Sequence, residues 1–261
     1  MSSQIDNKEH LQDNQKNKYG FIIVFLFLIW LFYPNYNGFI KSCYWANNFI
    51  FCVSKILHVN NTPDYVHYRN NAIYLAKVYR NNPTPAYKEM DRAIASYSAN
   101  QENGIIKTLH RDAAIIRLYY GDKDEALTEL LSIRNRDAND NLRIAILMAD
   151  DSRFDEAKPY CKSIIVKSQK AISGYVCMAY VYEKSGDIDT ATQLYNALIQ
   201  LNSNNENVYL ERSYFKKRHG DEQGAAEDIN KAKSIYPDVK SDGISIIDKA
   251  VNVKELPLSV M

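Results

Sequence analysis

Glycine, proline and net charge are all scarce in this chain, and each scarcity excludes a class of protein. The 261 residues include only 9 glycines and 7 prolines, which favours helices over a loop-rich β fold. The formal net charge is +1, which argues against a protein that grips the phosphate backbone of a nucleic acid. Hydrophobic residues make up 46% of the chain, so it is able to bury a core.

Catalytic and ligand-binding patterns are also missing from the sequence. It contains no glycine-rich phosphate loop, no Gly-x-Ser-x-Gly and no His-Glu-x-x-His. The five histidines are scattered and have no partner at a metal-ligand spacing; they are His10, His58, His67, His110 and His219. We therefore expect a protein that is not an enzyme and that holds no cofactor or metal.

The four cysteines form two pairs that lie far apart in the sequence. Neither Cys43 and Cys52 nor Cys161 and Cys177 have the spacing of a zinc site. Buried free thiols are the favoured interpretation. A disulfide is the alternative if the domain lies outside the cytosol.

Residues 175 to 237 contain one sequence pattern that occurs twice, with the two copies 34 residues apart. The equivalent pairs are Tyr175 and Tyr209, Tyr180 and Tyr214, Gly186 and Gly220, Asp187 and Asp221, and Ala191 and Ala225. A period of this length indicates a repeated pair of helices. The glycines lie where the first helix must end and the chain must reverse, because glycine tolerates positive φ. The alanines fall inside the second helix, where two backbones pass closely.

These positions resemble the tetratricopeptide repeat family. The family pattern is an aromatic residue, two residues, Leu-Gly, two residues and Tyr, followed by Gly, Ala, an aromatic residue, Ala and Pro. The first copy has Tyr175, Met178-Ala179, Tyr182, Gly186, Ala191 and Tyr195. The second has Tyr209, Arg212-Ser213, Lys216, Gly220, Ala225, Ile229, Ala232 and Pro237, and departs from the pattern at three positions of its first helix. The resemblance implies an all-α fold, a right-handed superhelical solenoid of helical hairpins.

The same helix and turn alternation extends over residues 64–238, and we expect about five repeats there. The helices expected before the two clear copies are Tyr65–Tyr79, a degenerate partner around Ala86, Met90 and Ala93, then Ile106–Tyr120 with Asp124–Ile133, and Leu142–Ala149 with Phe154–Val166. Residues 239–261 are expected to hold a capping helix, Gly243–Val251, and a tail. Ser241 or Asp242 would cap this helix, and its apolar side would dock on the final repeat.

The N-terminal region is expected to attach the chain to a membrane. Residues 1–18 are a polar tail, and 19–36 form an apolar segment with flanking aromatic residues, typical of a transmembrane anchor. A cleaved signal peptide and a buried helix are the alternatives, but no small-residue cleavage site follows Phe32. Residues 37–60 predict an amphipathic helix that either lies at the membrane interface or caps the repeats.

The resemblance also implies a concave face, lined by the first helix of each repeat, that binds a partner protein. Its contact positions correspond here to Arg111, Leu142, Val176 and Leu210, and to Ile115, Ile146, Tyr180 and Tyr214. The alternative for the second set is packed core between helices. Some family members clamp the terminal carboxylate of a chaperone tail with Lys and Asn at fixed groove positions, which here hold Val176, Cys177, Tyr180, Leu210, Glu211 and Tyr214, so that clamp is not visible.

These observations predict a membrane-anchored scaffold or adaptor that mediates protein–protein interaction in the assembly or stabilisation of a membrane or envelope complex. The expected partners are proteins at the concave face and a membrane at residues 19–36, with no nucleic acid. A bacterial inner-membrane protein with its repeats in the periplasm fits best. The alternatives are an enzyme or a lipid- or glycan-handling protein that uses the groove, and an organelle import receptor.

Overall fold

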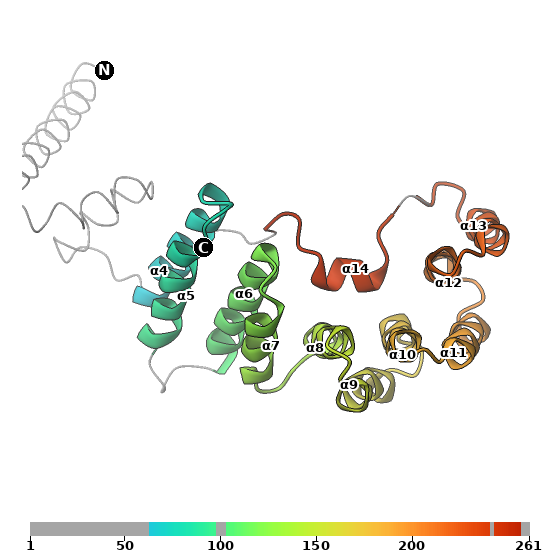
Figure 1. Cartoon of the computed structure of the whole chain (residues 1–261), viewed down its shortest axis with the longest axis horizontal. Coiled ribbons are helices and arrows are strands. Elements are labelled where there is room, and N and C mark those ends of the chain that lie inside the picture. The colour runs from blue at the N-terminus through green and yellow to red at the C-terminus, as the bar shows by residue number, and fades with distance from the viewer. Residues whose placement is uncertain (1–62, 98–102, 241–242, 257–261) are drawn as a thin grey trace, which may run out of the picture. The chain divides into compact units, whose positions relative to one another are not determined.

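A computed structural model describes residues 63–97, 103–240 and 243–256 of the chain (Figure 1). All of them belong to one compact unit, Pro63–Met261. The predicted polar tail, membrane anchor and amphipathic helix therefore lie outside the described residues. Within the described ranges, no helix has both the length and the apolar character that a bilayer crossing requires.

The described residues form helices joined by short turns, with no strand among them. The helices are α4 (Asp64–Val78), α5 (Thr84–Ser96), α6 (Asn103–Tyr120), α7 (Lys123–Ser132), α8 (Ala138–Asp150), α9 (Phe154–Lys167), α10 (Ile172–Lys184), α11 (Ile188–Leu201), α12 (Glu206–Arg218), α13 (Glu222–Ile235) and α14 (Ile246–Val251). From α4 to α13, consecutive helices pack as hairpins, α4 with α5 through to α12 with α13. The predicted all-α fold of stacked hairpins is confirmed.

Glycines in left-handed backbone end the first helix of three hairpins. Gly121, Gly186 and Gly220 have φ angles of 88°, 87° and 76°. After each glycine, an aspartate N–H donates to the carbonyl five residues earlier, as from Asp187 to Tyr182 at 2.9 Å. This is the hydrogen bond that closes a helix with a C-terminal glycine. Ser152, with a φ of 60°, takes the glycine's place in the turn between α8 and α9.

The alanines of the second helices make close packing of the hairpins possible. Ala191 and Ala225 are fully buried, as the repeat pattern predicts. One apolar core extends from α6 to α14, and a second lies among α4, α5 and α6. A larger side chain at either alanine would have to push two helices apart.

A disulfide joins α9 of one hairpin to α10 of the next. Cys161 and Cys177 are fully buried, with a Cα–Cα distance of 5.5 Å. The prediction of free thiols is wrong for this pair. The stacking of the second helix of one hairpin on the first helix of the next brings the two thiols together. Cys43 and Cys52 lie outside the described residues.

The C-terminal helix occupies a different place from the predicted one. It begins at Ile246, and Ser245 caps it by accepting a hydrogen bond from the Asp248 N–H. Helix α14 packs mainly against α8 and α10, and α12 of the final hairpin contacts its N-terminal end (Figure 1). Ile247 and Val251 belong to the same apolar core as those helices, and their burial there removes apolar surface from water.

Candidate protein-binding face

The C-terminal segment lies on one face of the hairpin stack, which we call the inner face: the side of α8, α10 and α12 that contacts residues 243–251 (Figure 1). The segment runs back along the stack. A Cβ atom placed on Gly243 would lie 3.0 Å from the hydroxyl oxygen of Tyr214, on α12. Leu256, at the other end, packs against the core of α4, α5 and α6. The inner face thus already holds a peptide of this chain.

Glu211 of α12 binds the N-terminal end of α14. Its carboxylate oxygen Oε1 accepts a hydrogen bond from the backbone N–H of Ile246 at 2.9 Å. Ile246 is the first residue of the helix, and its N–H has no partner within the helix. Burial raises the pKa of Glu211 from 4.5 to about 7; the Ile246 N–H and the charges of Arg218 and Lys249 oppose this shift, and Asp248 adds to it.

The raised pKa predicts a pH-dependent stability that Glu211→Gln removes. A carboxyl group whose pKa is higher in the folded than in the unfolded protein favours folding when it is protonated. Its contribution to the free energy of unfolding is complete below the unfolded-state pKa and is lost as pH rises through the folded-state pKa. We expect the thermal midpoint of the wild-type unit Pro63–Met261, measured against Glu211→Gln, to fall as pH rises from about 4.5 to about 7. A constant difference between the two proteins across this range would contradict the prediction.

Arg143 of α8 binds the opposite end of α14. Its Nε donates to the carbonyl oxygen of Ala250 at 3.0 Å, one of the last carbonyls of the helix and thus one without a partner inside it. Burial lowers the pKa of Arg143, against the nearby carboxylates of Asp140 and Asp137. No carboxylate of the described residues forms an ion pair with Arg143 within 4.0 Å. The interaction of its guanidinium group is therefore with a neutral carbonyl of the C-terminal segment.

The neighbouring arginine on α6 is fully engaged in ion pairs. Arg111 donates to Asp140 and to Asp137, at 2.8 and 2.7 Å. These two aspartates form a capping box at the start of α8. The Asp137 side chain accepts a hydrogen bond from the Asp140 N–H, and the Asp140 side chain accepts one from the Asp137 N–H. Burial raises the pKa of Asp140, but hydrogen bonds from Arg111 and the Asp137 backbone hold it below its usual range. Arg111 thus fixes α6 to α8.

The predicted contact residues divide into core and partly exposed positions. Five of them are buried in the described structure: Ile115, Leu142, Ile146, Val176 and Leu210. Tyr180 and Tyr214 are half-buried and pack against the same core. The Tyr180 hydroxyl donates to Asp150 at 2.6 Å. Of the predicted set, the two tyrosines are the aromatic side chains that retain exposed surface.

Sequence reasoning placed Glu211 at a groove position of the family's carboxylate clamp but predicted neither Glu211 nor Arg143 as a contact residue, although a signal was present. Each follows a predicted contact position, Leu210 or Leu142, by one residue. In the repeat between them, the equivalent residue is Cys177, which is fully buried. A charged residue at the same repeat position as a buried cysteine could have been predicted to face the inside of the stack. That the two charged residues bind the two ends of one helix could not have been predicted.

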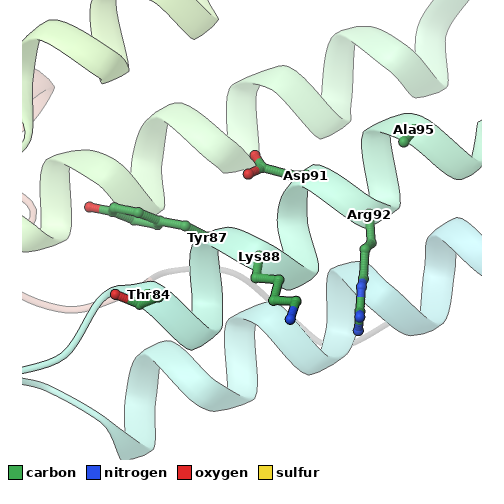
Figure 2. Close-up of a pocket in the computed structure, with 6 residues that line it drawn as sticks. All are labelled: Thr84, Tyr87, Lys88, Asp91, Arg92 and Ala95. Carbon is green, nitrogen blue, oxygen red and sulfur yellow. The ribbon is translucent and has the colours of Figure 1, made fainter.

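A shallow pocket elsewhere carries no comparable arrangement. Figure 2 shows its lining side chains, all from α5: Thr84, Tyr87, Lys88, Asp91, Arg92 and Ala95. Tyr87 donates to Asp122 and lies under the guanidinium of Arg117, and Arg92 pairs with Glu89 at 2.6 Å. The contacts of Tyr87 tie α5 to the next hairpin, and the pair of Arg92 with Glu89 lies within α5. In the described ranges, no group of three His, Cys, Asp or Glu side chains could hold a metal ion.

Comparison with known proteins yields structural likeness without close relatives. No protein-family model matches the chain, and no curated protein matches it. Among solved structures, the chain is similar to MamA from Desulfovibrio magneticus RS-1, at 15% identity and a TM-score of 0.48 over 68% of this chain and 98% of that one. It is similar to YrrB, described as a TPR protein with an unusual peptide-binding site, at 16% identity and a TM-score of 0.45 over 71% and 92%. Pseudomonas aeruginosa PilF gives 17% identity and a TM-score of 0.44 over 78% and 90%.

The hairpins themselves define the fold as tetratricopeptide-repeat-like. From α6 to α13, a turn with a left-handed residue, glycine in three hairpins and Ser152 in one, is followed five residues later by a buried alanine. The described part of the chain is therefore a TPR-like helical solenoid.

Proposed function

We propose that this chain is a membrane-anchored scaffold whose inner face binds a partner protein. The observation that carries the proposal is the way in which the inner face binds α14. The face holds a helical segment through apolar side chains, a carboxylate at its first N–H and a guanidinium at one of its last carbonyls. Helices bound in apolar grooves are a recurring mode of protein recognition.

The proposed setting is a bacterial inner membrane, with residues 19–36 as the anchor and the repeats in the periplasm. The apolar character of that segment supports the anchor. The buried disulfide between Cys161 and Cys177 supports an oxidising compartment for the repeats. There, the scaffold would assemble or stabilise an envelope complex.

The anchor is expected to remain in the mature protein. No small-residue cleavage site follows the apolar run, so signal peptidase has no substrate there. Intact mass and N-terminal sequencing of the protein from a membrane fraction test this. A mature N-terminus between Pro34 and Cys43 would show that the segment is a cleaved signal.

Tyr180 and Tyr214 are the proposed anchors for the partner. Aromatic side chains that anchor a binding site can each cost about 2 kcal/mol or more of binding energy when truncated. The variant Tyr180→Ala with Tyr214→Ala is expected to lose the partner that co-purifies with the wild-type chain in mild detergent. Tyr236→Ala is the matched control, since Tyr236 is 52% exposed and follows α13.

The folded state of the double variant decides what the result means. Retained helical circular dichroism with loss of the partner supports the inner face as the binding site. A double variant that stays folded and keeps its partner contradicts it. If the double variant unfolds, both tyrosines are core residues and the contact assignment fails.

A further inference from the structure

We propose that residues 243–256 are a built-in ligand of the inner face, and that the partner is a short amphipathic helix that replaces α14 in the same orientation. This inference rests on the proposed function, because it specifies how the same face is used. It adds the chemical character of the partner and the release of residues 243–256 that must precede partner binding.

Helix α14 has the features of a bound ligand more than those of a structural element. It has six residues, which is too few for a helix to be stable in water by itself. Its shape is therefore imposed by the face on which it lies. Ile247, Ala250 and Val251 supply its buried surface, and the hydrogen bonds of Glu211 and Arg143 hold its two ends.

Both end contacts take an ionisable group of the hairpins at least partly out of water, which costs free energy. Glu211 is 6% exposed and Arg143 is half-buried, and neither forms an ion pair within 4.0 Å among the described residues. Removing charge from water without an opposite charge disfavours the closed arrangement. Departure of the C-terminal segment would let both groups regain water. The turns within the hairpins and the disulfide between α9 and α10 do not involve the segment, so in the proposal it leaves while the hairpins stay folded.

The face specifies the kind of helix that can compete. The partner needs adjacent aliphatic residues and a second apolar pair four positions later, as in Ile246, Ile247, Ala250 and Val251. Its direction is fixed by the ends of the face. A reversed helix would place its free carbonyls against Glu211 and its free N–H groups against Arg143, and both contacts would be repulsive.

The probe for this proposal is a fluorescent peptide with the sequence of residues 243–256, added to the full chain in detergent. In wild type the inner face is occupied, so binding is expected to be weak. Ile247→Asp with Val251→Asp should release the segment and strengthen probe binding by about tenfold or more. Ile244→Asp is the matched control, because Ile244 is 47% exposed, and it should bind like wild type. In the released background, Arg143→Met should weaken probe binding again, and a probe of reversed sequence should not bind.

A released variant that is folded by circular dichroism but binds the probe no better than wild type overturns the proposal. If that variant unfolds, hydrogen exchange on the wild-type chain decides. The amides of α14 are expected to exchange before those of α8 and α10, and exchange only together with the hairpins would overturn the proposal.

The two proposals fail separately. If the natural partner depends on Tyr180 and Tyr214 but the released variant gains no affinity for the probe, the inner face is a binding site without a built-in ligand. If the probe binds as expected while the double tyrosine variant keeps its partner, the segment is displaceable and the proposed function is wrong.

Discussion

Ala225→Phe should lower the free energy of unfolding by more than about 2 kcal/mol, whereas Ala226→Phe should leave it within about 0.5 kcal/mol. The two alanines are neighbours on α13 and receive the same new side chain. Ala225 is fully buried and Ala226 is exposed. The difference therefore measures the overpacking of two helices without any difference in helix propensity. Thermal melts of the unit Pro63–Met261 provide the comparison.

The equivalent change in the preceding repeat should behave alike. Ala191 is also fully buried, 34 residues before Ala225, and Gln193→Phe is its exposed control on α11. If both Ala191→Phe and Ala225→Phe left the melting midpoint unchanged, the repeat register that aligns the two hairpins would be wrong.

Loss of the disulfide should produce the second large effect. Cys161 and Cys177 close a loop with a sequence separation of 16, and a loop of this size contributes about 3 kcal/mol by restricting the unfolded chain. For a unit of this length, that corresponds to roughly 6 to 12 °C in the melting midpoint. We expect a thiol reductant to lower the midpoint of wild type by this amount.

The variant Cys161→Ala with Cys177→Ala is the control for the reductant. It should melt at a lower temperature than wild type under oxidising conditions and should not respond to reductant. Alkylation of the unfolded wild-type protein checks the bond directly. If both thiols react without prior reduction, the disulfide does not form and the support for an oxidising compartment is lost.

The disulfide and the C-terminal segment stabilise different parts of the molecule. The bond ties α9 to α10, whereas α14 rests on α8 and α10. A scaffold that exchanges its own segment for a partner needs hairpins that stay folded when the segment leaves. The covalent link between α9 and α10 would hold two hairpins together whether or not the segment is bound.

The hairpins could be predicted from the sequence because their signals are local. A glycine that ends a helix, an aspartate after it and an alanine five residues beyond the glycine act over distances of a single turn or hairpin. Predicted and observed helix ends agree to within a few residues, as for Tyr65–Tyr79 against Asp64–Val78. The burial of Ala191 and Ala225 follows from the same pattern.

The contents of the inner face could be predicted only in part. Leu142, Val176 and Leu210 were expected to line it, and the structure places them in the core of these helices. Tyr180 and Tyr214 keep some exposed surface, as a contact residue must. The contacts of Glu211 and Arg143 were not predicted, because they depend on a helix that was expected to dock on the final repeat.

The sequence by itself determined that this chain forms helical hairpins, where each one turns and which alanines lie between helices. Tertiary structure alone decided that Cys161 pairs with Cys177, that α14 lies on α8 and α10, and that Glu211 and Arg143 bind its ends. The physical reason is the separation of the groups involved. Arg143 and Ala250 are 107 residues apart and Glu211 and Ile246 are 35 apart, so no local periodicity relates them. They meet because stacked hairpins form a face on which the apolar side of α14 is buried.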